Sequence, residues 1–262
     1  MYGRAYKRFP RIGYACLSWL PLLELPQLGM AESKEQISDT VVVHRGRIAP
    51  LHARRAAEEI PNLFNDPYLR HFATVHQGDN EIGAGNSSMQ FILAPLIRRR
   101  IQADYGIDLR YKEIRSVGED PATRTIGHLM LQASLRRRHH SYPIRSVNIH
   151  TNTPDTQFKP HIDIVEGYTT SLALTPAVVS VHARDHRIVA EATVNPGDEV
   201  EVYSPEELEE REVHSFRPLP GIVRASLVTK YKVPAGYAAI DRIDFSRPDV
   251  HSIYFEPHPT ES

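Results

Sequence analysis

The 262-residue chain is long enough to bury a sizeable core, and one domain is the default expectation at this length. Its formal net charge is −1, with 24% charged residues, which argues against a general binder of nucleic acid or of anionic membranes. A single cysteine, Cys16, excludes an intramolecular disulfide and a zinc site built from several cysteines. A reducing cytoplasm is therefore the simplest expected location.

The N-terminal segment is interpreted as an extension that precedes the folded domain. Its basic residues are followed by an apolar stretch, but Pro21, Glu24 and Pro26 interrupt that stretch, which is atypical of a signal peptide. No window reaches the roughly 18–20 apolar residues of a membrane-spanning helix. We expect residues 1–29 to be a non-essential or disordered extension and residues 30–262 to form a single domain.

The first half of that domain is predicted to mix helices and strands. Three consecutive valines, Val41–Val43, favour a strand, and Pro61 is expected to end a helix that begins at Pro50. A later apolar stripe predicts a helix capped by Ser87 or Ser88. The predicted elements are a strand over 39–48, a helix over 50–60, a loop-rich region over 62–88, a helix over 89–105, a strand over 109–117 and a helix over 125–135.

From Pro143 onward the sequence changes to short β-type runs. Turn residues separate them, which is typical of an antiparallel sandwich or barrel, so the predicted fold class is α+β, mainly β. Ser204 and Glu207 form a predicted capping box, with Pro205 at the first helical position, so a short acidic helix or lid-like turn is expected over Ser204–Arg211. The predicted strands cover 144–152, 159–167, 168–175, 177–184, 186–194, 198–203, 212–218 and 221–233.

A pattern of metal-binding residues lies within these runs. His161 and Asp163 project from the same face, because side chains alternate along a strand. Together with His214 they provide two imidazoles and one carboxylate, the set with which non-haem Fe(II) oxygenases bind iron while leaving other positions open. Arg224 could bind a carboxylate of a keto acid through two parallel hydrogen bonds.

This conjunction resembles the Fe(II)/2-oxoglutarate-dependent oxygenase superfamily over residues 144–232. His161-Ile162-Asp163 is similar to the family's His-x-Asp, and His214 to its distal histidine. Arg224-Ala225-Ser226 is similar to the Arg-x-Ser of the isopenicillin-N-synthase-like branch, and Asn195–Val200 to a Pro-Gly-Asp turn of the family. The resemblance implies a double-stranded β-helix, or jelly roll, as a core at about 143–233, with N-terminal helices flanking it.

The same resemblance implies Fe(II), 2-oxoglutarate and O2 as cofactor and co-substrates. It implies hydroxylation of an amino acid, a peptide or another small specialised metabolite, free or carrier-bound, with release of succinate and CO2. No catalytic residue is expected beyond the metal ligands. The implied metal ligands are His161, Asp163 and His214, and the candidate co-substrate contacts are Arg224, Ser226 and Asn148.

Departures from related branches narrow the expected reaction. Halogenases of this kind carry a small residue where Asp163 stands, so its carboxylate favours hydroxylation, desaturation, epoxidation or cyclisation. Repair demethylases carry a second arginine where Lys230 stands, which argues against nucleic acid as the substrate. Prolyl-hydroxylase-like enzymes usually carry a lysine in place of Arg224.

Two alternatives stay open: a non-catalytic jelly-roll binding protein, and a cupin-like metalloenzyme without 2-oxoglutarate, in which Arg224 would be dispensable. The basic stretch Arg136–His140 is interpreted as a solvated helix end, with docking of an anionic substrate or carrier protein as the alternative. No nucleic-acid or membrane partner is expected. Proposed contributors to the substrate pocket are 83–86, Arg115, Arg136–Arg138 and the short helix from Pro205.

Overall fold

The computed structural model describes residues 33–67, 69, 73–77, 85–92, 114, 117–135, 144–156, 158–163, 166–185 and 187–232. The expectations for residues 1–29 and 136–140 fall outside these ranges. The first elements are β1 (Ser33–Gln36), β2 (Val41–Arg45), α1 (Pro50–Asn65), β3 (Thr74–Gln77), β4 (Asn86–Ile92) and α4 (Arg124–Leu135). The later elements are β5 (Ile144–Asn152), β6 (Phe158–His161), β7 (Gly167–Ala173), β8 (Ala177–His182), β9 (Ile188–Val194), β10 (Glu199–Ser204), the 3-10 helix η2 (Leu208–Glu210), β11 (Val213–Pro218) and β12 (Arg224–Lys232).

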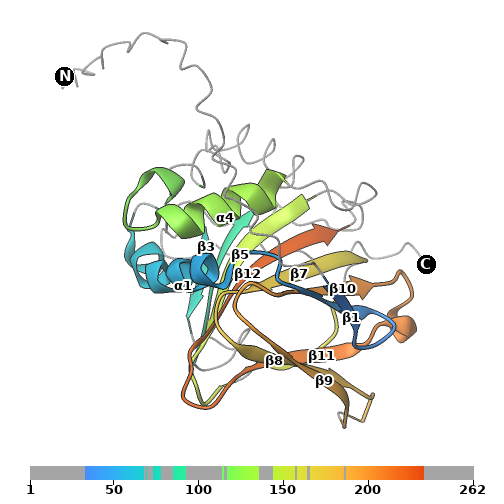
Figure 1. Cartoon of the computed structure of the whole chain (residues 1–262). Helices are drawn as coiled ribbons and strands as arrows, with labels where there is room; N and C mark the ends of the chain where they lie inside the picture. Colours follow the sequence, from blue (N-terminus) through green and yellow to red (C-terminus); the bar gives the residue numbers. More distant parts are fainter. Residues whose placement is uncertain are drawn as a thin grey trace, which may run out of the picture.

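The strands form two facing sheets with the connectivity of a jelly roll (Figure 1). An eight-stranded sheet has the order β1-β2-β10-β7-β12-β5-β4-β3, and a four-stranded sheet has the order β6-β11-β8-β9. From β5 to β12 the chain alternates between the sheets except at the β8–β9 pair, which lies within the smaller sheet, and the paired strands are antiparallel throughout. This arrangement confirms the predicted mainly β fold with a double-stranded β-helix core and flanking helices.

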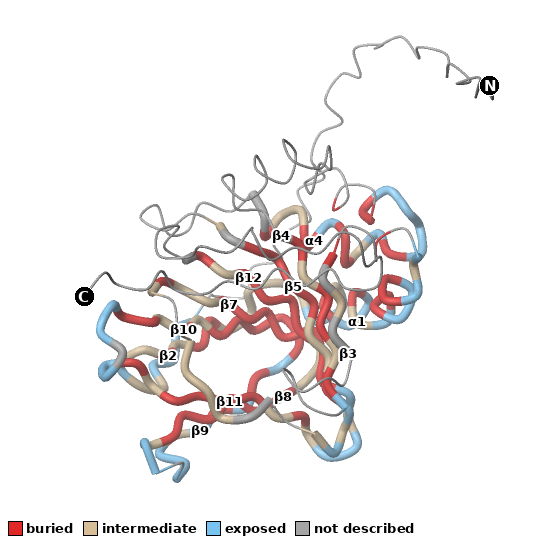
Figure 2. Tube along the Cα trace, turned by 180° about the vertical axis from the view of Figure 1, so that it is seen from behind, coloured by how far each residue is buried: buried red, intermediate tan, exposed pale blue. Residues whose placement is uncertain are grey.

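The central strands of the larger sheet are buried on both faces, because α1 and α4 cover one face and the smaller sheet faces the other (Figure 1). Successive side chains of each strand point alternately toward the helices and toward the smaller sheet. Val147, Ile149 and Leu227 pack with the helices, so their neighbours Asn148 and Ser226 project into the jelly roll. Figure 2 shows buried residues along β5, β7 and β12 through the middle of the molecule. The interior that faces the smaller sheet therefore carries polar side chains as well as apolar ones.

The two helices pack against each other as well as against the sheet. The helix predicted to stop at Pro61 continues to Asn65, because Leu63 and Phe64 in its last turn are buried in the core. Glu59 of α1 accepts a hydrogen bond from the backbone N–H of Ile126 at 2.8 Å and so satisfies a free donor at the start of α4. No helix of the described part of the chain has the length and apolarity needed to cross a bilayer.

Two predicted elements of the first half are wrong where the structure describes them. Residues 89–92, predicted to begin a helix, belong instead to β4, since Met89 and Phe91 face the helices with period two and the strand pairs with β5. Within the predicted strand over 109–117, Ile114 and Val117 adopt helical conformation. In both places long-range packing overrides a local pattern of apolar residues.

The turn before β10 requires glycine at its centre. Gly197 has φ +96°, and a Cβ atom added there would lie 2.2 Å from the carbonyl oxygen of Ile48. The backbone N–H of Ile48 also donates to the carbonyl oxygen of Gly197 at 3.1 Å. This turn therefore ties the segment after β2 to the jelly roll at a contact that excludes any larger residue.

Gly197→Ala is expected to destabilise the fold by about 2–5 kcal/mol, the sum of left-handed strain and overpacking. Gly221→Ala is the matched control, because Gly221 has φ +74° but nothing within 4 Å of its added Cβ. It is expected to cost only about 1–2 kcal/mol. Urea unfolding of both variants measures the difference, and equal losses would show that the contact with Ile48 carries no energetic weight.

Candidate active site

The structure brings two of the predicted metal ligands together at one end of the smaller sheet. His161 is the last residue of β6, and His214 is directly opposite it on β11. Their ring centroids lie 4.5 Å apart with the rings tilted by 53°. The strand pairing therefore presents two imidazoles side by side, although the residues are far apart in the sequence.

A backbone contact orients the ring of His214. Its Nδ1 lies 3.4 Å from the carbonyl oxygen of Glu212, and since a carbonyl can only accept, this contact favours the tautomer with the proton on Nδ1. The lone pair of Nε2 is then available for a metal, an arrangement typical of metal-binding histidines. The Glu212 side chain in turn accepts hydrogen bonds from Ser38 and Thr40, which fixes the start of β11 against the β1–β2 connection.

Asp163 follows β6 and is held at its side chain and at its backbone. The hydroxyl of Thr169 on β7 donates to Asp163 Oδ2 at 2.6 Å, and Arg211 donates to the carbonyl oxygen of Asp163 at 3.0 Å. Among the described residues, no three His, Cys, Asp or Glu side chains lie in an arrangement that would hold a metal ion as they stand. The assignment of Asp163 as the third ligand thus stays a prediction.

Arg224 begins β12 and is buried in the jelly roll, with 3% of its surface exposed. Its Nη1 donates to Asn152 Oδ1 at 2.7 Å, and its guanidinium lies 4.5 Å from the ring centroid of Phe216. Burial lowers the pKa of Arg224 to about 9, because the cation is removed from water, yet the group keeps its charge at neutral pH. A buried cation of this kind is stabilised by any anion that reaches it.

Ser226 and Asn148 each point a buried polar atom into this interior. Ser226 Oγ and Asn148 Oδ1 are buried and have no hydrogen-bond partner among the described residues. Ser226 also lines a small cavity with Arg224 and Phe216. Since unpaired buried polar atoms are costly, both are well suited to contact a polar ligand. The cavity measures about 10 Å³, room for about one water, so a larger ligand requires side chains to move.

A chain of ring contacts connects the histidine pair to Arg224. His214 and Phe216 lie on the same face of β11, with ring centroids 6.2 Å apart and planes at 85°. Phe216 then stacks under the guanidinium of Arg224. The two predicted functional groups, the ligand pair and the arginine, therefore lie at two ends of one continuous wall in the jelly roll.

His150 also belongs to this interior, since it lies opposite Ser226 on the neighbouring strand. Burial lowers its pKa well below the usual range, and the positive charges of Lys230, Arg224 and His161 add to this, whereas Asp163 opposes it. His150 therefore lies within electrostatic reach of both ends of the site. Its period-two relation to Asn148 on β5 is the sequence signal that places it there.

Asn152 and Asn86 are further residues whose role sequence reasoning missed. They stand opposite each other on β5 and β4, and Arg224 stands opposite Asn152 on β12. Asn152 accepts from Arg224 through Oδ1, and its amide nitrogen donates to Asn86 Oδ1, which also accepts from the Thr156 hydroxyl at 3.3 Å. This row of amides fixes the orientation of the buried guanidinium.

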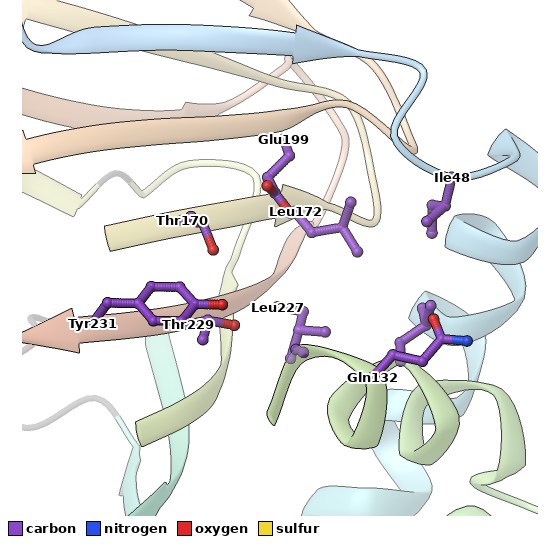
Figure 3. A pocket seen from close by; sticks show the side chains of 10 residues that line it. Ile48, Gln132, Thr170, Leu172, Glu199, Leu227, Thr229 and Tyr231 are labelled. Atoms are coloured by element: carbon purple, nitrogen blue, oxygen red, sulfur yellow. The ribbon is translucent and has the colours of Figure 1, made fainter. Parts of the chain in front are cut away.

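A second small cavity lies on the opposite face of the larger sheet, between the sheet and α4 (Figure 3). Leu129 and Gln132 of α4 and Leu172 and Leu227 of the sheet line it. It also measures about 10 Å³ and contains none of the predicted site residues. We interpret it as a packing gap beneath α4.

The predicted walls of the substrate pocket are only partly described. Residues 83 and 84, Arg115 and Arg136–Arg138 lie outside the described residues. The short acidic helix or lid-like turn predicted over Ser204–Arg211 is an irregular segment that contains the short η2. Arg211 donates to the carbonyl oxygens of Pro205 and Glu206, which a regular helix would use itself.

Comparison with known protein families and with curated proteins finds no match. Among solved structures, the chain is similar to a prolyl hydroxylase from Trichoplax adhaerens in complex with a hypoxia inducible factor peptide fragment (11% identity, 74% of this chain and 84% of that chain, TM-score 0.43). It is also similar to the non-haem α-ketoglutarate-dependent epimerase SnoN from nogalamycin biosynthesis (14%, 73% and 76%, 0.43). A third is a prolyl-4-hydroxylase from Pseudomonas putida (13%, 74% and 92%, 0.39).

At these identities and TM-scores, the similarities assign neither a family nor an activity to the chain. The donor set itself fits an Fe(II) site: two imidazoles and one carboxylate are ligands that iron accepts. The buried Arg224 and the unsatisfied Ser226 hydroxyl fit an anionic co-substrate.

Proposed function

We propose that the protein is an Fe(II)- and 2-oxoglutarate-dependent oxygenase. One observation carries this proposal: the His161–His214 pair and the buried cation of Arg224 lie at two ends of the same jelly-roll interior. A chelating keto acid with a distal carboxylate needs a metal at one end to bind its keto-acid group and a cation at the other end to bind its distal carboxylate. A binding protein without chemistry requires neither feature.

The residues divide into three tasks. His161, Asp163 and His214 would hold Fe(II), which supplies the O2-dependent oxidation coupled to conversion of 2-oxoglutarate to succinate and CO2. Arg224 would bind the distal carboxylate, with the Ser226 hydroxyl as a second donor. The surrounding apolar side chains of the inner core, such as Val179 and Val200, would keep water from the reacting groups.

The proposed substrate is an amino acid, a peptide or another small metabolite, and hydroxylation is the proposed outcome. Asp163 supports an oxidation that inserts oxygen or removes hydrogen, since its carboxylate would occupy the position that halogenases leave to chloride. Asn148 supports the proposal of a ligand with a hydrogen-bond donor, because its buried Oδ1 has no hydrogen-bond partner among the described residues. Its position on β5 also suits contact with the co-substrate.

Anaerobic titration with Fe(II) and 2-oxoglutarate tests the proposal. The visible charge-transfer band of a metal-chelated 2-oxo acid is expected in the wild-type protein, and succinate release then serves to screen substrates. The band is expected to require much more 2-oxoglutarate in Arg224→Ala and to disappear in Asp163→Ala. A well-folded protein that retains no iron and gives no band would exclude the oxygenase and favour a binding protein.

A band that is unaffected by Arg224→Ala would contradict the role of the arginine. Metal retention with no response to 2-oxoglutarate would instead support a cupin-like metalloenzyme. Circular dichroism of each variant provides the control that the fold is preserved.

A further inference from the structure

The guanidinium of Arg211 donates hydrogen bonds to backbone carbonyl oxygens of two separate segments. It is buried, with 7% of its surface exposed. Nε donates to the carbonyl oxygen of Pro205 and Nη2 to that of Glu206, both at 2.7 Å, while Nη1 donates to that of Asp163 at 3.0 Å. The planar fork of arginine matches three acceptors in fixed directions, which the single ammonium of lysine cannot reproduce.

This side chain connects the segment after β6 to the segment before β11, the two strands that carry His161 and His214. Arg211 lies two residues before β11, and it donates to Asp163, which lies two residues after the end of β6. Thr169 holds the carboxylate of Asp163 while Arg211 holds its carbonyl group, so the residue is fixed at both ends. The position of Asp163 relative to β11 therefore depends directly on Arg211.

A second arginine donates hydrogen bonds to the backbone of the same segment. Arg184, in the connection between β8 and β9, donates from Nη2 to the carbonyl oxygens of Glu209 at 2.8 Å and Arg211 at 2.9 Å. Segment 205–210 is thus fastened from two sides, and its side chains Glu206 and Glu207 are exposed. Arg184 provides a matched control for any effect that arises only from loosening this segment.

We propose that Arg211 is a positioning residue that places Asp163 for metal binding and fastens segment 205–210 to the metal-binding end of the jelly roll. The proposal rests on the proposed function, because it takes Asp163 as a ligand. Burying a guanidinium is costly unless its donors are satisfied, and three carbonyl contacts offset that cost while they fix the backbone. Arg211 acts through Asp163 and contacts no reacting atom itself.

Arg211→Met and Arg211→Lys, compared with Arg184→Met, test the proposal. Anaerobic competition with a chelator measures Fe(II) affinity, and we expect a loss of about 10–100-fold for Arg211→Met, as for removal of partners of metal ligands. A smaller loss is expected for Arg211→Lys and little change for Arg184→Met. The charge-transfer band with 2-oxoglutarate should shift or weaken in the Arg211 variants only.

Hydrogen exchange of the metal-free protein gives a readout that does not depend on iron. Both Met variants are expected to speed exchange in segment 205–210, whereas only Arg211→Met should speed it at 161–163. Should Arg211→Met fail to fold, Arg211→Lys carries the comparison.

Each outcome distinguishes this proposal from the proposed function. Equal Fe(II) affinity of wild type and the Arg211 variants would overturn the positioning role. An equal loss in Arg184→Met would also overturn it, since loosening of the segment would then suffice. A wild-type protein that binds no Fe(II) would instead contradict the oxygenase assignment, and the exchange at 161–163 would still report on the contact with Asp163.

Discussion

Replacement of His214 by glutamine is expected to abolish Fe(II) binding and turnover while the protein stays folded. His214 is buried opposite His161, and its Nδ1 contact with the Glu212 carbonyl directs Nε2 toward the proposed metal. Glutamine preserves a polar side chain of similar reach but removes the imidazole ligand. The loss of metal affinity should exceed the loss of about 10–100-fold that follows removal of a hydrogen-bond partner of a metal ligand.

His182→Gln is the matched control for this variant. His182 is also buried on the smaller sheet, but it follows Val181, which packs in the inner core, so it projects from the other face. There its Nε2 shares a hydrogen bond with Ser215 Oγ at 2.8 Å. The control is expected to lose some stability but to retain metal and turnover. Retention of both by His214→Gln would exclude His214 as a ligand.

Asn152→Asp is expected to weaken 2-oxoglutarate binding by about 10–100-fold, through the loss of about 1.5–3 kcal/mol of charge-assisted hydrogen bonding. The neutral amide accepts from Arg224 at 2.7 Å, and a carboxylate in its place would pair with the guanidinium directly. The co-substrate would then compete with an internal anion for the same cation. Titration of the charge-transfer band at constant Fe(II) measures the change.

Asn86→Asp is the control, because Asn86 accepts a hydrogen bond from Asn152, which in turn accepts one from Arg224. It adds the same charge one strand farther away and retains its acceptor oxygen. We expect a much smaller effect on 2-oxoglutarate and none on Fe(II) alone. Equal effects of the two substitutions would mean that added charge in the interior, not direct pairing with Arg224, governs affinity.

The C-terminal half of the fold was readable from the sequence because its strands are short and separated by turn residues. The run 144–152 matches β5, and the Pro-Gly-Asp turn appears where Gly197 adopts a positive φ. The first half was harder to predict. Met89 and Phe91 fit a helical stripe as well as an alternating strand, and a short apolar pattern does not distinguish the two.

Sequence by itself determined which chemical groups are present and roughly which strands carry them: His161, Asp163, His214 and Arg224 are identified by their type and order. Only the tertiary structure decided which of them meet. Strand pairing places His161 opposite His214, and Asn152 opposite Arg224. No sequence motif marks Asn152 or Arg211, because their proposed roles depend on hydrogen bonds to partners distant in the sequence. Such contacts exist only once the sheets have assembled.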